Sequence, residues 1–378
     1  MFVELHMIQN FGPSCLNRDD TNTPKDCQFG GYRRARISSQ CLKRAIREYF
    51  KSQLEDLKGN LGVRTRMLPQ KIIEELVANG KDAESAETVT KNVLNGIGLK
   101  IDSKKPNKTE VILFLNNDTP EKIAKVILSD WDAFSAKKVS SDDLKKLNPI
   151  IKEIQDDLNA DIALFGRMVA SKTDLNVDSS CYVAHALSTH KVDMEMDFFT
   201  AIDDLQEETE SGAGMMGIIM YNSSCFYRYT VVDLDQLSSN LQGDFDKTKR
   251  ILKGFIQASV HAIPTGKQTS MAAFNLPDFI MVTVRKDQPW SLVNAFVDPA
   301  KLGLKDTDLI SQSNSKFDTY LKQMAEMYGS LSDADIHFCC TGDRSAEYLV
   351  EIGTHHKSVK ELIESLGETI NERYSSSS

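Results

Sequence analysis

The sequence predicts an α+β fold built on a ferredoxin-like core, because strand and helix patterns alternate in the order that this core requires. Short runs rich in aromatic and β-branched residues indicate strands, and apolar residues at helical spacing indicate helices. The predicted order is strand, helix, strand, strand, helix, strand, which is also that of an RNA-recognition motif. The six elements are expected at residues 2–8, 40–50, 161–165, 225–234, 245–263 and 279–284.

The first strand and the first helix have the clearest patterns. Val3, Leu5 and Met7 alternate with Glu4 and His6, as in a strand with two distinct faces. Serines at positions 38 and 39 are good N-cap residues for the helix that follows. The apolar stripe of this helix consists of Leu42, Ala45, Ile46, Tyr49 and Phe50.

The remaining core elements are shorter or lie far apart. Residues 161–165 form an apolar run that favours a strand, and residues 225–234 (CFYRYTVVDL) form a stronger one. Residues 245–263 have helical periodicity, and residues 279–284 are apolar throughout.

Two long insertions separate these elements. Residues 69–158 are mainly helical in pattern, with one possible strand at 111–115, and are expected to pack beside the sheet. Residues 166–222 have weak periodicity and contain the tract SGAGMMGIIM. A structureless loop of that length is unusual inside a compact domain, so a projecting hairpin is expected there. Further helices are expected at 306–327 and 358–373.

Composition and motifs exclude several classes of protein. The chain has 378 residues, 41% of them hydrophobic and 26% charged, as in ordinary soluble proteins. It has no apolar run long enough to span a bilayer and no signal-peptide pattern at its start, so a cytoplasmic location is expected. Its seven cysteines form no CxxC pair, and no nucleotide-loop, zinc-protease or nucleophile-elbow motif is present. We therefore expect no metal, no cofactor and no catalytic activity.

Charge is distributed very unevenly along the chain. The net charge is −9, which by itself argues against nucleic acid as a partner. However, residues 25–47 contain seven basic residues and one acidic residue, Asp26, whereas residues 191–211 contain one lysine and eight acidic residues. One part of the surface can therefore hold an anion while the whole protein stays acidic.

The basic segment has the chemistry needed to hold a phosphate chain. Gly30 and Gly31 allow a close backbone approach, and Ser38 and Gln40 lie at a helix start, where the dipole favours anions. The alternative is a capped surface helix with a solvated basic face. Because the arginines are dense beside the glycine pair, we favour phosphate binding. The basic residues of this segment that we predict to bind are Lys25, Arg34, Lys43, Arg44 and Arg47.

Other candidate binding residues carry weaker signals. Phe198 and Phe199 could stack on bases, although paired phenylalanines more often belong to a core. Met168 is by default a core residue, and Lys267, in the turn IPTGKQTS, is a possible phosphate contact. Asp26 could bind a metal or activate a 2′-hydroxyl, but a single carboxylate without partners is usually a turn residue.

Several segments together resemble one known family. They are PSCLNRDD (13–20), KDCQFGGYRRARISSQCLKRAIR (25–47), DIALFGRM (161–168), AHALSTH with DFFTAIDDLQ (184–190 and 197–206), FYRY (226–229) and AAFNLPD (272–278). In this order they resemble the backbone subunit of type I-E CRISPR surveillance complexes (Cascade), the CasC family. This is the seventh CRISPR-associated family, within the RAMP proteins.

The resemblance implies a hand-like molecule that binds RNA. Its RNA-recognition-motif palm would comprise residues 1–60, 161–166 and 223–300, with helical fingers at 61–160, a projecting thumb hairpin at 167–222 and a C-terminal helical part at 301–378. Several copies would stack along a CRISPR guide RNA, which pairs with target DNA while the protein holds the backbone. The other implied partners are subunits of the fifth and sixth CRISPR-associated families and the large and small subunits of the complex.

The resemblance also assigns individual residues. Met168, Phe199 and Thr200 would lie where the thumb of one copy crosses the guide and displaces a base. The residues implied to hold the guide backbone are Arg18, Lys25, Ser38, Gln40, Lys43 and Arg47.

Two alternatives to a non-catalytic RNA-binding subunit remain open at this point. The first is a metal-dependent ribonuclease that uses Asp26, since related RAMP subunits of type III systems carry a cleaving aspartate in the corresponding loop. The second is a protein-only scaffold in which the basic segment of one copy meets the acidic 191–211 segment of the next.

Overall fold

The structure is a computed structural model that describes residues 1–54, 61–136, 139–156, 158–170, 172–201, 215–301, 308–329, 331, 333–342 and 347–375. The chain divides into two compact units. Unit 1 comprises Met1–Tyr49, Tyr182–Asp233 and Leu252–Ser378, and unit 2 comprises Phe50–Cys181 and Leu234–Ile251. Each unit is therefore assembled from segments that lie far apart in the sequence.

Unit 1 is organised around a large mixed sheet. Its strands follow the order β14-β13-β12-β1-β11-β9-β3-β2, and β10 and β8 also pair with β11. The pair β13–β14 is parallel, and the other pairs along this order, together with β10–β11, are antiparallel. The strands are β1 (Phe2–Ser14), β2 (Asp26–Phe29), β3 (Tyr32–Ile37), β8 (Cys181–Val183), β9 (Ala186–Ser188), β10 (Glu195–Ala201), β11 (Met215–Asp233), β12 (Phe279–Arg285), β13 (Asp335–Cys340) and β14 (Thr354–His355).

The centre of this sheet is built on β1. It pairs with β11 from Phe2, opposite Asp233, to Phe11, opposite Ser224, and with β12 on its other side. The four strands β12-β1-β11-β9 are thus neighbours and are all antiparallel. The predicted strands at 2–8, 225–234 and 279–284 are confirmed, and the first two extend beyond the predicted bounds.

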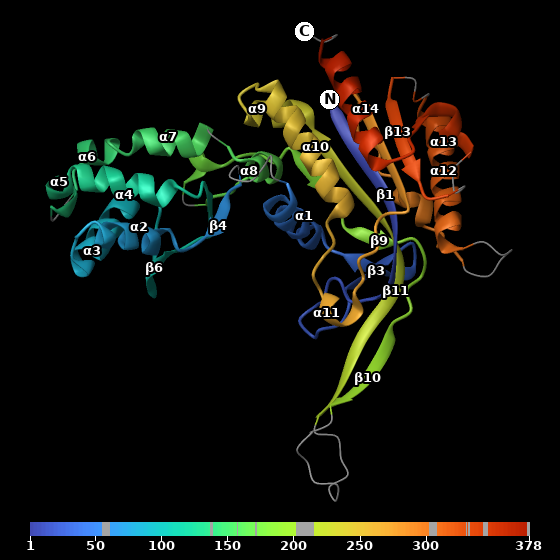
Figure 1. Ribbon diagram of the computed structural model, residues 1–378, viewed down its shortest axis with the longest axis horizontal. Helices are drawn as coiled ribbons and strands as arrows, with labels where there is room; N and C mark the ends of the chain where they lie inside the picture. The colour runs from blue at the N-terminus through green and yellow to red at the C-terminus, as the bar shows by residue number, and fades with distance from the viewer. Residues whose placement is uncertain are drawn as a thin grey trace, which may run out of the picture. The chain divides into compact units, whose positions relative to one another are not determined.

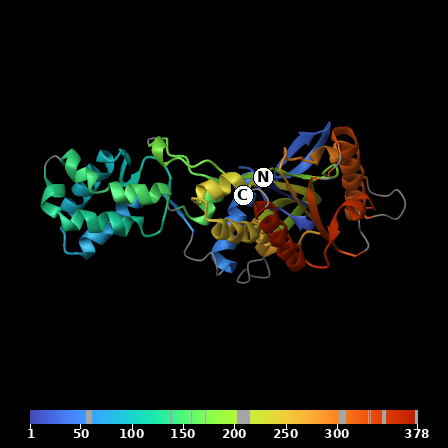
Figure 2. The same ribbon diagram turned by 90° about the horizontal axis from the view of Figure 1, so that it is seen from above.

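Helices cover both faces of the sheet (Figure 1). On one face His6 and Tyr227 pack against Phe317 of α12, and on the other Arg228 donates a hydrogen bond to the backbone carbonyl of Ser259 on α10. Figure 2 shows α10 beside α14, where Lys253 contacts Gly367. The helices of this part are α1 (Ser39–Gln53), α10 (Phe245–His261), α11 (Gln268–Met271), η3 (Val293–Phe296), α12 (Leu309–Tyr328), α13 (Glu347–Ile352) and α14 (Val359–Ser375).

The face under α12 contains a buried polar network. The Tyr229 hydroxyl and the Trp290 amide both donate to Oε2 of Glu4, each at 2.7 Å. The Tyr227 hydroxyl lies 2.8 Å from Nδ1 of His6 and accepts a hydrogen bond from the Leu292 amide. Burial raises the pKa of Glu4 to about 6 and lowers the pKa of His6 to about 3. This network holds the segment before η3 against the sheet.

Unit 2 is mainly helical (Figure 2), and α2, α3, α4, α5 and α7 contribute to one apolar core. Leu68, Val93, Ile127 and Phe134 are fully or almost fully buried in it. No helix in the described ranges is long and apolar enough to cross a membrane. The elements of unit 2 are β4 (Val63–Thr65), α2 (Leu68–Ala78), α3 (Ala83–Gly96), β5 (Ile101–Asp102), β6 (Lys105–Thr109), β7 (Leu113–Leu115), α4 (Thr119–Ser129), α5 (Trp131–Ser135), α6 (Ser141–Lys145), α7 (Asn148–Asp156), α8 (Ala160–Phe165), η2 (Thr173–Leu175) and α9 (Leu234–Asn240).

The predicted strand at residues 161–165 is wrong, because this segment is helix α8. All six residues of α8 are buried, so no polar face reveals helical periodicity. The helix ends at Gly166, whose φ of 73° only glycine adopts easily. In the strand order, the neighbour of β11 on the side away from β1 is instead β9, a three-residue strand.

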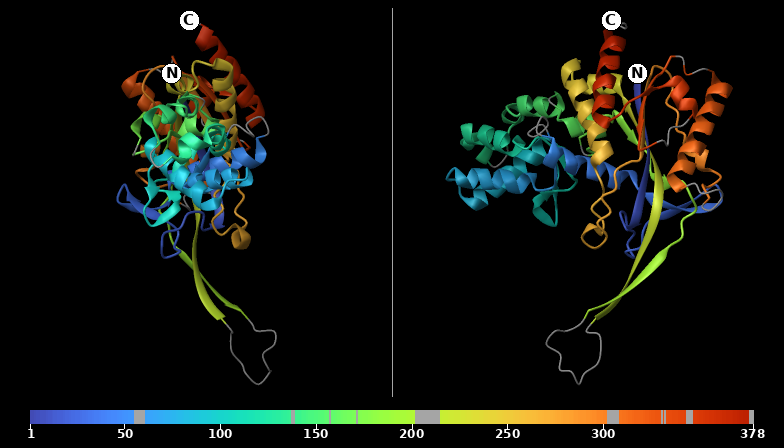
Figure 3. Two further views of the ribbon diagram at one scale, coloured as in Figure 1. Left: turned by 90° about the vertical axis from the view of Figure 1, so that its left-hand side faces the viewer. Right: turned by 45° about the vertical axis from the view of Figure 1, so that its right-hand side comes forward.

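The predicted projecting hairpin is present within residues 166–222 (Figure 3). β10 pairs with the first part of β11, from Glu195 opposite Tyr221 to Ala201 opposite Met215. Residues 202–214, which include five of the predicted acidic residues and the start of the glycine and methionine tract, lie outside the described residues. β11 then continues from the hairpin into the sheet.

Candidate nucleic-acid interface

The loop that precedes the basic segment (residues 25–47) starts beside the base of the hairpin. Ser14, at the end of β1, donates a hydrogen bond to the backbone carbonyl of Asn222. After Ser14 the chain forms a loop that returns at Lys25, whose amide donates to the Asn17 carbonyl at 2.8 Å. The Arg36 amide donates to the Lys25 carbonyl at 2.9 Å, so the loop is joined to β3.

The start of α1 is held to the same loop. The Ser38 amide donates to Oδ1 of Asn17 at 2.8 Å, and the Ser38 hydroxyl accepts from the Cys41 amide at 3.3 Å. Ser38 is therefore the N-cap, as predicted, and its side chain is buried. Its hydroxyl stabilises the helix start, whereas Gln40 is exposed in the first turn.

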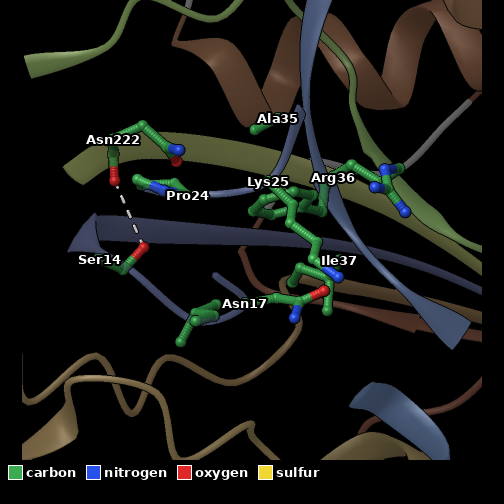
Figure 4. A pocket seen from close by; sticks show the side chains of 10 residues that line it. Ser14, Asn17, Pro24, Lys25, Ala35, Arg36, Ile37 and Asn222 are labelled. Atoms are coloured by element: carbon green, nitrogen blue, oxygen red, sulfur yellow. Dashed lines mark hydrogen bonds between the residues drawn. The ribbon is translucent and has the colours of Figure 1, made fainter. Parts of the chain in front are cut away.

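These elements enclose a small pocket at the base of the hairpin (Figure 4). Lys25 lies between the Ser14–Asn222 pair and Arg36 in this view, and the Arg36 side chain points outward. Asn17, Ala35, Ile37 and Phe226 are among the residues that complete its lining.

Two cysteines beside the loop are each influenced by two cations. Burial raises the pKa of the Cys41 thiol, and the charges of Arg44 and Lys25 oppose this increase. Burial also raises the pKa of Cys15, and Arg18 and Lys267 oppose that increase. The Cys41 thiol donates to the Leu16 carbonyl, so both cysteines lie at the loop between β1 and Lys25.

Lys267 lies near this loop because the preceding residue, Gly266, packs directly against the loop backbone. A methyl group at Gly266 would lie 2.5 Å from the carbonyl oxygen of Leu16 and 2.6 Å from that of Cys15. Only glycine allows the segment before α11 to lie so close to the loop. Lys267 follows with a left-handed φ of 54° and is half-buried. Lys267, 223 residues after Arg44 in the chain, therefore contributes a cation to the same surface.

Arg34 does not lie on this surface, which corrects the prediction that it binds RNA. Its side chain is 0% exposed and its guanidinium donates to three backbone carbonyls, those of Ser188, Phe296 and Val297. A side chain enclosed in this way cannot reach a phosphate.

Gly30 and Arg47 also have roles that differ from the expected ones. A methyl group at Gly30 would lie 2.4 Å from the carbonyl oxygen of Val297, so the close approach is to the chain itself. Arg47 is 8% exposed, so it is not on the open side of α1 where the sequence placed it. Lys43 is half-buried, and Arg44 is exposed.

Two residues near the pocket were not singled out from the sequence. Arg36 lines the pocket, and its Nη1 lies 3.2 Å from Nδ1 of His185. Burial, and then the charges of Arg36 and Lys25, lower the pKa of His185. Arg36 belongs to the basic segment and could have been found there. Nothing in the sequence indicated that His185 would lie beside it.

On the hairpin, Phe198 and Phe199 lie on opposite faces. Phe199 is opposite Gly217, and a methyl group on that glycine would lie 2.4 Å from the Phe199 ring. Phe199 therefore packs over its cross-strand neighbour and is half-buried, whereas Phe198 is 61% exposed. The predicted residue Thr200 shares the face of Phe198 and is also exposed.

Met168 is the one predicted binding residue in unit 2. It is 82% exposed and is therefore not the core residue that its position suggested by default. Its neighbour Arg167 is buried and donates to the backbone carbonyls of Phe114, Ile154 and Leu175. The buried Val169 follows, so the exposed Met168 lies between two well-anchored residues.

The site does not favour a ribonuclease centred on Asp26. The Asp26 carboxylate accepts a hydrogen bond from Nε of Arg33 and forms an ion pair with the same guanidinium. Within the described residues, no group of three or more histidine, cysteine, aspartate or glutamate side chains is arranged to hold a metal ion. Asp26 thus acts as a structural partner within the β2–β3 hairpin.

Solved structures with the same fold come from CRISPR complexes. One chain, from a "CRISPR RNA-guided surveillance complex, pre-nicking", is 28% identical, with a TM-score of 0.87 over 98% of this chain and 100% of that one. A second, from a "CRISPR RNA-guided surveillance complex", is 25% identical with a TM-score of 0.76 and the same coverage. These likenesses support the resemblance to subunits of CRISPR surveillance complexes.

The family follows from the sequence as a whole. Residues 3–365 match the model of the CT1975-like protein family, Cas_CT1975. The chain therefore belongs to the CT1975-like protein family. No curated protein matches it.

Proposed function

We propose that this chain is the non-catalytic, RNA-binding backbone subunit of a type I-E Cascade. In this role, several copies stack along the spacer of a guide RNA. The observation that carries the proposal is that Lys25 and Arg36 line one pocket at the base of the hairpin, and that Gly266 brings Lys267 against the same loop, in a protein of net charge −9. The family and the full-length likeness to chains of RNA-guided surveillance complexes support the same role.

The strand order supports an RNA-recognition-motif palm. The antiparallel order β12-β1-β11-β9, with α1 after β1 and α10 after β11, is the arrangement expected of a ferredoxin-like core. The basic loop leaves this sheet at Ser14, beside the base of the hairpin. A guide RNA on this surface would touch the loop, the start of α1 and the segment before α11.

The hairpin supports a thumb that works outside its own unit. Met196, Phe198, Met216 and Ile218 are each at least 61% exposed on the described part of the hairpin. Cross-strand pairing places all four on one face. Such a continuous apolar face is typical of a surface that binds a partner.

A salt titration tests RNA binding by the basic surface. Lys25→Ala combined with Arg44→Ala removes two cations from it. Affinity for a fluorescein-labelled single-stranded RNA should fall, and the slope of log affinity against log salt should decrease by about 1.4, since each lost phosphate contact removes about 0.7. The matched control is Lys357→Ala with Lys360→Ala, two exposed lysines beside and within α14, which should leave both quantities unchanged.

Assembly along RNA tests the backbone role separately. Sedimentation of the protein with RNAs of increasing length should give complexes whose mass increases in steps of one chain. A single protein per RNA, whatever the length, would contradict the backbone role. Equal affinities of the two double variants would contradict RNA binding by the basic surface.

A further inference from the structure

We infer that Arg34 is the positioning residue of the guide-binding surface: it does not touch RNA but fixes the β2–β3 hairpin that carries Arg36 and supports Lys25. This inference rests on the proposed function. It gives one arginine of the basic segment a task different from that of its neighbours.

The geometry around Arg34 is that of an internal clamp. Nη1 donates to the Ser188 carbonyl of β9 at 3.1 Å, and Nη2 donates to the carbonyls of Phe296 and Val297 at 2.6 and 3.2 Å. Phe29 and Tyr32, on either side of the hairpin turn, each place a ring 5.8 Å from the guanidinium carbon. One side chain thus joins β3, β9 and the end of η3.

Only arginine can make this set of contacts. Its guanidinium is planar and offers five donors in a fixed fork, whereas a lysine ammonium is a point charge on a flexible stem. Burial lowers the pKa of Arg34, but arginine stays charged in proteins. A buried charge is costly unless hydrogen bonds compensate it, and here three carbonyl oxygens accept from the two terminal nitrogens, whereas Nε is buried without a hydrogen-bond partner.

The acceptors of the clamp are themselves held in place. The segment before η3 is anchored by the hydrogen bonds from Trp290 to Glu4 and from Leu292 to Tyr227. Gly30 adds a second contact between the hairpin turn and Val297. The hairpin is therefore fixed at its turn to a segment that the core immobilises.

The clamp acts on the basic surface through two backbone connections. Asp26 and Cys27 of β2 pair with Ala35 and Arg34 of β3, so Lys25 enters the hairpin directly. The Arg36 amide also donates to the Lys25 carbonyl, and Nε of Arg36 donates to the Asp26 carbonyl at 3.2 Å. Loosening the hairpin at Arg34 would therefore displace both pocket cations together.

The test compares Arg34→Met and Arg34→Lys with the wild-type chain, using a fluorescein-labelled single-stranded RNA of mixed sequence. If hairpin order falls to a tenth, apparent affinity falls about tenfold, because only the ordered fraction binds. Both variants should show this loss, and their salt slopes should equal that of the wild type, since the same phosphates are contacted once the hairpin is ordered. Hydrogen exchange should accelerate within residues 26–37.

Arg228→Met is the matched control, because Arg228 is another buried arginine of the sheet. It donates to the side-chain oxygen of Gln9 and to the backbone carbonyl of Ser259 in α10. Its loss should lower thermal stability but leave RNA affinity unchanged at a temperature where the protein is folded. Gly30→Ala, which pushes the hairpin turn away from Val297, should reproduce the affinity loss even if the Arg34 variants do not fold.

Three results separate the possible failures. If Arg34→Met lowers the salt slope by about 0.7 and Arg34→Lys restores it, then Arg34 contacts a phosphate directly and the inference is wrong. If Arg34→Met and Gly30→Ala, once folded, bind as well as Arg228→Met, the clamp is only structural and the inference is also wrong. If the wild-type chain itself shows no salt-dependent RNA binding, the proposed function fails.

Discussion

One strand, β11, has two halves with opposite environments. From Asn222 to Asp233 it pairs with β1, and Cys225, Phe226 and Tyr227 are at most 3% exposed. From Met215 to Tyr221 it pairs only with β10 in the described part of the chain, and Met215, Met216 and Ile218 are more than half exposed. Both halves carry large apolar residues, yet only those of the half beside β1 are buried.

This difference shows that a strand's apolar residues can serve folding or binding, depending on what covers them. In the sheet, helices on both faces remove these side chains from water, and their burial stabilises the fold. A two-stranded hairpin has no such cover and is only marginally stable alone. Its exposed methionines and phenylalanine can therefore still contribute hydrophobic free energy when an intermolecular contact buries them.

The largest expected difference between the two halves concerns stability. Phe226→Ala should lower the free energy of unfolding by about 3–5 kcal/mol, because it leaves a cavity in the core beside Phe11. Phe198→Ala should change it by less than about 0.5 kcal/mol, since that ring is exposed. Urea unfolding monitored by circular dichroism measures both values. Similar losses would show that the hairpin face is buried within the monomer.

A smaller difference concerns pH. Burial lowers the pKa of His6, which packs against Tyr227 in the covered half, from 6.5 to about 3. Below pH 6.5 His6 is therefore protonated in the unfolded chain but neutral in the folded chain. The free energy of unfolding decreases as pH falls below 6.5. Between pH 6.5 and 5 this costs roughly 2 kcal/mol. Glu4, whose pKa rises from 4.5 to about 6, acts in the opposite direction between those values.

Two variants isolate the contribution of His6. Subtracting the pH profile of unfolding free energy for His6→Gln from that of the wild type removes most of the Glu4 contribution, which both proteins share. Phe198→Ala is the counterpart in the exposed half: it changes no ionisable group, and its profile should follow the wild type. Parallel profiles for His6→Gln and the wild type would contradict a neutral, buried His6.

The smallest expected effect lies within the hairpin. Phe199→Ala removes the ring that covers Gly217, and the hairpin should lose about 0.5–1 kcal/mol of local stability. Phe198→Ala should not have this effect, because its ring lies on the other face. Hydrogen exchange of the amides in β10 and the first part of β11 reports local opening. Equal exchange in the two variants would show that the Phe199 ring does not stabilise the pairing.

Local patterns were enough to predict most of the fold. The alternation of β1, the apolar β12 and the periodicity of α10 and α12 gave the right element types, because each depends on neighbouring residues. Helix α8 was mistaken for a strand because a fully buried segment has no polar face. Strand β9 was missed because three residues are too few to show alternation.

The site was only partly predictable, for a different reason. The segment and its charge were evident from composition, but the burial of a given arginine depends on acceptors elsewhere in the chain. Arg34 is paired with carbonyls 154, 262 and 263 residues away, and backbone carbonyls leave no trace in a sequence. The roles of Arg47 and Phe199 likewise depend on what packs against them.

The long separation between Arg34 and Phe296 also affects how the protein is made. Chains emerge from the ribosome with the N-terminus first, at a limited number of residues per second. The hairpin at residues 26–37 is therefore synthesised long before the carbonyls of Phe296 and Val297 exist to receive it. During that interval Arg34 lacks two of its three acceptors, and only the Ser188 carbonyl of β9, which is synthesised earlier, is there to bind it.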